Sequence, residues 1–149
     1  MKKLTLEYWI PIVFWLLSMY LFSTDMMSSS ETSRFIVPVL KLLLPGLSPS
    51  GIDFWHAVIR KFAHVTEYFI LAVFLYRALR FDGCGRIDAN LRTIVFVALA
   101  ALLDEFHQSF VPSRTATIID VGYDCLGGVW ALWMIAAYEL RRLRSYPVL

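Results

Sequence analysis

The sequence has little charge and few cysteines, and each shortage excludes a class of protein. Only 17% of the 149 residues are charged, and the net charge is +2. No stripe of Lys and Arg follows one helix face, so we expect no nucleic-acid partner. Two cysteines, Cys84 and Cys125, do not make a disulfide framework. We see no internal repeat, and the length fits a single domain over residues 1–149.

Apolar residues dominate instead. They make up 58% of the chain, against about 45–50% in soluble domains. Four apolar runs predict an all-α integral membrane protein, multi-pass in the plasma membrane, with four transmembrane helices. The first run has a basic start but no small-x-small cleavage pattern after it, so we expect a retained helix rather than a signal peptide. The predicted spans are about 6–23, 56–80, 91–109 and 117–139.

The connections between these runs are of three kinds. Residues 24–34 are polar and rich in serine, which predicts a loop. Residues 35–47 are apolar but too short to span, and prolines interrupt them, so we expect a short re-entrant or interfacial segment, or else an apolar loop packed on the bundle. Residues 81–90 contain two glycines and read as a loop. Pro112 cannot lie inside a helix, which predicts a turn before the last span.

The distribution of Lys and Arg predicts the orientation, because cytoplasmic segments are enriched in them. With both termini in the cytoplasm, nine basic residues fall at the inner ends of the spans and five at the outer ends. The inner set is Lys2, Lys3, Arg77, Arg80, Arg86, Arg92, Arg141, Arg142 and Arg144; the outer set is Arg34, Lys41, Arg60, Lys61 and Arg114.

This topology brings polar side chains from three helices to the same outer end. Lys61, His64 and Glu67 are spaced three apart and cover one side of the second span. Gly127 and Gly128 follow the polar residues of the fourth span and allow a close approach of a neighbouring backbone. We therefore expect an outward-opening polar pocket. Its predicted ligand-binding residues are Lys61, Asp104, His107, Gln108, Arg114, Asp120 and Asp124.

Glu67 and His64 form the pair that most resembles catalytic machinery. They lie three residues apart on one helix, so their side chains are able to touch. A poorly solvated carboxylate beside an imidazole is able to act as a general base near neutral pH. Glu105 is a second candidate base. The alternative is a buried hydrogen bond between helices, which is common in membrane bundles.

Arg114 lies in the outer turn, between acidic helix ends. A guanidinium there is able to clamp a phosphate or carboxylate through two parallel hydrogen bonds. The alternative is an ion pair with a neighbouring acidic residue that fixes the turn. The candidate partners for that pair are Asp104, Glu105 and Asp120.

The imidazole and carboxylate groups also raise the question of a metal site. Such donors suit zinc or manganese. However, no His-x-x-x-His or Glu-x-x-His pair stands on one helix. We therefore expect neither a metal nor another cofactor.

Two blocks of the sequence resemble the VanZ-like family of small membrane proteins. RKFAHVTEY, residues 60–68, is similar to the family's R/D-K-x-x-H-x-x-E-Y. DEFHQSFVPSRTATIIDVGYDCLGG, residues 104–128, is similar to its D-E-x-H-Q-x-F-x-P-x-R followed by D-V-x-x-D-x-x-G. Ser113 and Ala116 depart from that pattern, where Gly and Ser are common. The resemblance implies a membrane protein of the cell envelope and a role in resistance to teicoplanin, a lipoglycopeptide antibiotic.

Three functions remain open at this point. The first is an outer-leaflet protein that binds an anionic lipid, a lipid-linked wall precursor or the lipoglycopeptide itself. The second is an intramembrane hydrolase or transferase acting on such a lipid, with Glu67 or Glu105 as base and Arg114 as clamp. The third is a purely structural membrane partner. A transporter is disfavoured, because the inner half of the predicted bundle offers no polar path. The sequence predicts no particular oligomer.

Overall fold

The computed structural model describes residues 3–145, so the basic Lys2 lies outside the described residues. Within that range the regular structure is entirely helical and no strand occurs, which confirms the all-α prediction. The elements are α1 (Lys3–Ser23), the short 3-10 helix η1 (Asp25–Met27), α2 (Ser29–Leu43), α3 (Pro49–Phe81), α4 (Arg86–Gln108) and α5 (Ile118–Arg144).

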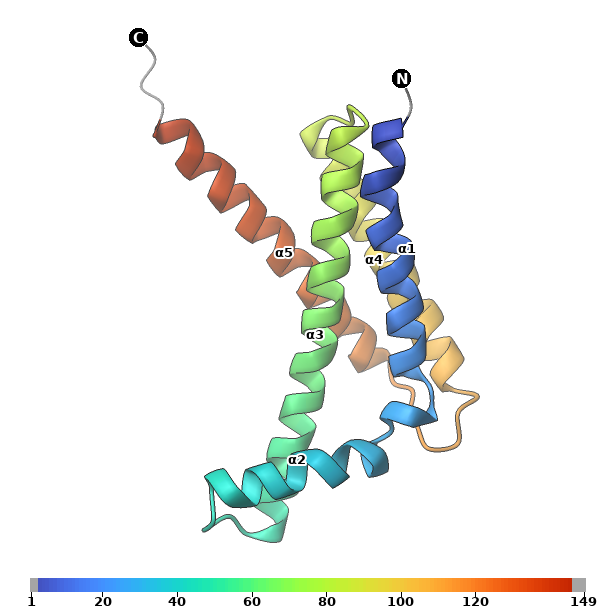
Figure 1. Cartoon of the computed structure of the whole chain (residues 1–149), viewed down its shortest axis with the longest axis vertical. Helices are drawn as coiled ribbons and strands as arrows, with labels where there is room; N and C mark the ends of the chain where they lie inside the picture. Colours follow the sequence, from blue (N-terminus) through green and yellow to red (C-terminus); the bar gives the residue numbers. More distant parts are fainter. Residues whose placement is uncertain (1–2, 146–149) are drawn as a thin grey trace.

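The helices form a bundle with one splayed member. α1, α3 and α4 run side by side, while α5 crosses them obliquely and diverges toward its C-terminal end (Figure 1). α2 lies across the opposite end of α3, near η1 and the 110–117 turn (Figure 1). The two described ends of the chain and the α3–α4 turn therefore lie at one end of the bundle, called here the terminus end. The other end, with α2 and the 110–117 turn, is called the α2 end.

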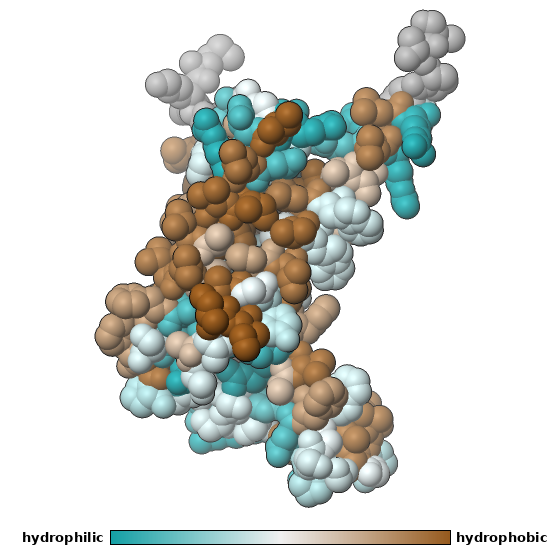
Figure 2. Space-filling model, turned by 180° about the vertical axis from the view of Figure 1, so that it is seen from behind, coloured by the Kyte–Doolittle hydropathy of each residue, from teal (hydrophilic) through white to brown (hydrophobic). Residues whose placement is uncertain are grey.

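Two helices are long and apolar enough to cross a membrane by length and composition. They are α1, over Leu6–Ser23, and α5, over Ile118–Arg144. Figure 2 shows a hydrophobic band across the middle of the face in view, with hydrophilic surface above it and a further hydrophilic patch below. The chain is therefore an all-α protein with two candidate spans, and these features suggest a membrane protein.

The prediction of a loop over residues 24–34 is wrong for its second half. α2 already begins at Ser29, because the Ser28 hydroxyl accepts a hydrogen bond from the backbone N–H of Glu31 at 3.4 Å. Serine at this position caps a helix by satisfying one of its unpaired N–H groups. The serine run that reads as a loop is therefore a helix start, and α2 continues through Pro38.

The bounds of α3 and α4 also differ from prediction. α3 begins at Pro49 rather than residue 56, because the Ser48 hydroxyl accepts from the backbone N–H of Gly51 and proline fits the first helical turn. α4 begins at Arg86, so the predicted 81–90 loop shrinks to a tight turn. In that turn Gly83 has a φ of 86°, which favours glycine.

Two adjacent glycines let α5 pack directly on its neighbours. A Cβ atom at Gly127 would lie 2.2 Å from the backbone oxygen of Val65 in α3. A Cβ atom at Gly128 would lie 2.9 Å from a methyl group of Val97 in α4. Real atoms do not approach so closely, so only glycine fits at residue 127 without moving a helix. The expected close approach is confirmed, and it fixes the position of the polar turn of α5 that precedes it.

Candidate functional site

Two adjoining cavities lie at the α2 end, where α3, α4 and the 110–117 turn meet. Their volumes are about 270 Å³ and 450 Å³. The two cavities share Arg60, His64, Gln108 and Arg114. The smaller cavity also has Glu67 and Asp104 in its wall; its apolar wall is Met19, Phe22 and Met27. The larger one extends past Lys61 and Asp120 toward α2. The expected polar pocket therefore exists, and helices from across the sequence form it.

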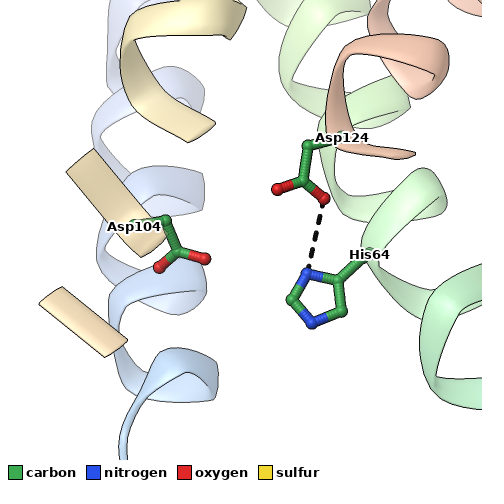
Figure 3. Close-up of side chains that lie close together, drawn as sticks. All are labelled: His64, Asp104 and Asp124. Atoms are coloured by element: carbon green, nitrogen blue, oxygen red, sulfur yellow. Dashed lines mark ion pairs between the residues drawn. The ribbon is translucent and has the colours of Figure 1, made fainter. Parts of the chain in front are cut away.

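The deepest polar contact joins α3 to α5. His64 Nδ1 lies 3.4 Å from a carboxylate oxygen of Asp124, whose side chain is 0% exposed. This pairing follows from the helix packing. Gly127, three residues after Asp124, brings α5 onto α3 at Val65, the neighbour of His64. Figure 3 shows Asp104 of α4 facing the same pair. His64 thus pairs with Asp124 in this structure, rather than with Glu67 as the sequence had suggested.

Lys61 and Asp120 form an ion pair at the wider cavity. The Lys61 ammonium also lies 5.5 Å from the ring centre of Tyr123, within cation–π range. Asp120 stands in the first turn of α5, and its backbone N–H donates to the Thr117 hydroxyl at 3.2 Å. A carboxylate in the first turn also suits the positive end of the helix dipole. Asp120 therefore holds Lys61 at the cavity wall.

Arg114 connects the 110–117 turn to the end of α1. Its guanidinium donates hydrogen bonds to the backbone oxygens of Phe22 and Thr24, the latter at 3.1 Å. Ser113 adds a hydrogen bond to the Asp25 carboxylate. Burial lowers the pKa of Arg114, nearby Arg60 lowers it further, and neighbouring carboxylates oppose the shift.

Among the described residues, the hydrogen bonds of Arg114 go to these carbonyls and not to Asp104, Glu105 or Asp120. The predicted ion pair of the turn is therefore absent from this structure. The same guanidinium lines both cavities, so it fixes the turn and still faces the pocket.

Three predicted site residues do not line the two cavities: Asp124, whose pairing with His64 is described above, and also Glu105 and His107. Glu105 is 7% exposed, and its carboxylate accepts the backbone N–H of Thr117 at 2.7 Å. It thus caps the start of α5 from outside the cavity walls. His107 contacts α1 instead, with its Nδ1 3.3 Å from the Ser23 hydroxyl and its ring 4.9 Å from that of Tyr20.

Three further predicted residues do meet. Gln108 donates to the Asp104 carboxylate at 2.8 Å, as their i, i+4 spacing suggested. Glu67 reaches the same small cavity. Its backbone oxygen accepts a hydrogen bond from the Trp15 indole at 2.9 Å, which ties α1 to this level of α3. Glu67, Asp104 and Gln108 therefore all line the smaller cavity.

Two residues that line the cavities, Arg60 and His56, were not among the predicted site residues. Arg60 reaches both of them, although it was counted only as a helix-end charge. Its place at the head of the RKFAHVTEY block is the signal that could have identified it. His56 lines the larger cavity, and its Nε2 lies 3.2 Å from the Thr32 hydroxyl of α2. Nothing in the sequence indicated that contact, because it depends on where α2 lies.

Comparison with known proteins identifies a family. No curated protein and no solved structure matches the chain. The VanZ/LLP1 family matches residues 8–139, a stretch that contains every cavity residue named above. The chain therefore belongs to the VanZ/LLP1 family.

Proposed function

We propose that this protein is a multi-pass plasma-membrane protein, a single domain with both termini in the cytoplasm and α1, α3, α4 and α5 crossing the bilayer. The excess of Lys and Arg at the terminus end supports this orientation. α2 then lies in the outer interface, with Phe35 76% and Leu42 80% exposed and available to lipid. The cavities at the α2 end open to the outer leaflet.

We propose further that these cavities bind the anionic headgroup of a lipid or a lipid-linked cell-wall precursor. The observation that carries this proposal is the presence of two guanidinium groups, Arg60 and Arg114, in the walls of both cavities. Guanidinium groups bind phosphate through paired, charge-assisted hydrogen bonds. Lys61 lies at the wider cavity and adds a third cation.

The other walls fit a ligand that is polar at one end and apolar at the other. Met19, Phe22 and Met27 form an apolar wall in the smaller cavity, beside Arg60 and Arg114. Binding sites for small molecules combine such apolar surface with a few placed polar groups. A headgroup held by the cations would leave the first part of its lipid tail against this wall.

Native mass spectrometry of the detergent-purified protein tests this proposal. We expect retention of polyprenyl phosphate, and much weaker retention of the uncharged polyprenol of the same chain length. Arg60→Gln should weaken phosphate binding by about tenfold or more, since a charged hydrogen bond contributes about 1.5–3 kcal/mol. Arg34→Gln, an exposed arginine paired with Glu31 outside the cavities, is the matched control. Equal retention of phosphate and alcohol would exclude headgroup recognition.

The role in antibiotic resistance is tested in cells. The wild type and Arg60→Gln are expressed at equal membrane levels in a sensitive Gram-positive host. We expect the wild type to protect against teicoplanin but not against vancomycin, which lacks the lipid tail, and Arg60→Gln to lose that protection. Absence of protection by well-expressed wild type would separate this member from the resistance role while leaving lipid binding to the measurement above.

A second function is supported by Glu67. Its side chain faces the same small cavity as Arg114 and His64, so a general base and an electrophilic clamp would both reach a bound headgroup. We propose as the alternative an intramembrane hydrolase or transferase that acts on the phosphate ester of such a lipid. Glu67 would take a proton from the attacking water or hydroxyl.

Product analysis distinguishes the two functions. The protein is incubated with polyprenyl phosphate and polyprenyl diphosphate in detergent, and released phosphate is measured. Turnover that is lost in Glu67→Gln, with lipid binding retained, would establish the enzyme. Binding without turnover in the wild type would leave the protein as a binding protein. A structural partner would show neither, and neutral substitutions in the cavity would leave its cellular role intact.

A further inference from the structure

Three side chains from three different helices lie close together beside the smaller cavity. His64 comes from α3, Asp104 from α4 and Asp124 from α5 (Figure 3). One donor atom of each lies within 4.8 Å of the others. Ligands of a zinc ion stand about 2.0–2.2 Å from it, so three of them around one ion lie about 3.3–3.8 Å apart. Side-chain rotations that move the donor atoms by about 1 Å are enough to close such a site.

The hydrogen bonding of this cluster is incomplete in a way that points to a ligand. Asp124 is 0% exposed, and neither of its carboxylate oxygens has a hydrogen-bond partner among residues 3–145. His64 Nδ1 is also buried without one, since the 3.4 Å ion pair does not meet hydrogen-bond geometry. A carboxylate removed from water without hydrogen bonds is costly. A cation between the three side chains would satisfy all of these atoms together.

The donor set suits a particular class of cation. One imidazole and two carboxylates favour zinc or manganese over softer metals, which prefer sulfur. Gln108 donates to the Asp104 carboxylate at 2.8 Å and so holds one ligand in orientation, as outer partners of metal ligands do. Three protein ligands also leave a coordination position open.

We infer that His64, Asp104 and Asp124 form a binding site for a divalent transition-metal cation. This site could not be predicted from the sequence, because each of the three helices contributes only one ligand. Its ligands therefore form no spaced pair on a single helix. The site is open toward the smaller cavity, whose wall includes His64 and Asp104. It requires no lipid, and it would exist whether or not the cavity binds one.

Metal titration of the detergent-purified, chelator-stripped protein is the first test. Zn²⁺ and Mn²⁺ are titrated separately without added lipid, and bound metal is counted by elemental analysis after dialysis. We expect one equivalent per chain. Because no lipid is present, failure here overturns the metal site and leaves the headgroup proposal standing. A wild type that retains neither metal would show that His64 and Asp124 form an ion pair only.

Matched variants locate the site. Asp104→Asn should weaken metal binding by more than about 100-fold, the upper end of what loss of an outer partner alone costs. An asparagine there keeps an acceptor for Gln108, so the variant should fold. Asp53→Asn removes an equal charge from an exposed residue of the larger cavity outside the cluster, and its affinity should stay unchanged. Equal affinities in both variants would overturn the assignment.

Spectroscopy identifies the ligands independently of affinity. Electron spin-echo measurements on the bound Mn²⁺ should show modulation from one imidazole nitrogen, and His64→Gln should lack it. A nitrogen signal that persists in His64→Gln would assign the metal to another histidine. The metal-free melting temperature of each variant is recorded beside these data, so a folding defect is distinguished from the loss of a ligand.

Discussion

The two ends of the bundle differ in how deeply their ion pairs are buried: side-chain exposure is 47% and 26% for Arg86 and Glu139, but 18% and 0% for His64 and Asp124. At the terminus end, Arg86 and Glu139 form a 2.7 Å ion pair that is partly exposed, and the Tyr76 hydroxyl donates to Glu139 at 3.3 Å. At the α2 end, Asp124 is fully buried, and its oxygens accept no hydrogen bond from the part of the chain that the structure describes. Exposed pairs contribute little and are easily replaced. Buried groups left without partners are costly and mark functional sites in membrane proteins.

The cavities at the two ends also differ in the exposure of the arginines in their walls. The terminus end has a cavity of about 710 Å³, where α5 diverges from α3 (Figure 1). Its arginines, Arg77, Arg80 and Arg142, are exposed. The cavities at the α2 end are smaller, yet Arg60 and Arg114 are only partly exposed there and face carboxylates. Glu139 also lines the cavity of the terminus end, so the two cavities differ chiefly in how deeply their charged groups are buried.

The largest expected loss of stability comes from substitution of Gly127, whose contact with Val65 positions α5 against α3. Gly127→Ala would force its new methyl group against the Val65 backbone oxygen and push α5 off α3. We expect a loss of about 3 kcal/mol in stability, the upper range for overpacking. Gly122→Ala, on the same helix with open space around it, should be neutral or stabilising by up to about 1 kcal/mol. Thermal unfolding in detergent measures both, and equal melting temperatures would contradict the packing described here.

The next effect concerns the link between the 110–117 turn and α1. Arg114→Ala removes the donors to the Phe22 and Thr24 carbonyls, and we expect a loss of about 2 kcal/mol, since hydrogen bonds from a charged group contribute about 1.5–3 kcal/mol. Arg114→Lys keeps the charge but not the fork of donors, so it should recover only part of the stability. Full recovery by lysine would show that charge alone holds the turn.

Glu105 allows a test of a cap at the cavity end. Glu105→Ala leaves the Thr117 N–H unpaired and should cost about 1–2 kcal/mol, in the range of a lost helix cap. Glu105→Gln retains a carbonyl acceptor and should cost well under that. If Glu105 were instead a catalytic base, Gln would abolish turnover of polyprenyl diphosphate while leaving the melting temperature intact. We expect Glu105→Gln to match the wild type in phosphate release, whatever its level, and to stay close to the wild-type melting temperature.

The smallest effect is expected at the terminus end. Arg86→Gln breaks a partly exposed ion pair with Glu139, so the change in unfolding free energy should be about 1 kcal/mol or less. Binding of polyprenyl phosphate, followed by native mass spectrometry, should stay at the wild-type level. A loss of binding similar to that of Arg60→Gln would remove the functional difference between the two ends.

Much of this architecture could be predicted from periodicity and apolar length. Those signals place the four long helices and bring their polar residues to one end, because helix order and short connections leave few alternatives. They fail at the helix starts. Ser28 and Ser48 read as loop residues, but each caps a helix through its hydroxyl. The capping serines could be recognised in the sequence, but the serine-rich composition favoured the prediction of a loop.

Side-chain partners were predictable only within a helix. The Asp104–Gln108 contact follows from its i, i+4 spacing. The His64–Asp124 pair and the capping role of Glu105 depend on how far α5 slides along α3 and α4. That position is set by Gly127, whose contact with Val65 no local pattern reveals. The sequence therefore indicates which residues gather, but not which of them touch.

Photocrosslinking tests most directly whether the α2 end is the binding end. Purified protein in detergent is irradiated with a polyprenyl phosphate that carries a diazirine close to the phosphate, and adducts are mapped by mass spectrometry. We predict adducts on the wall of the smaller cavity, at Phe22 or Met27, that excess polyprenyl phosphate suppresses and polyprenol does not. Adducts concentrated at Tyr8 and Tyr138, in the cavity of the terminus end, would contradict the account.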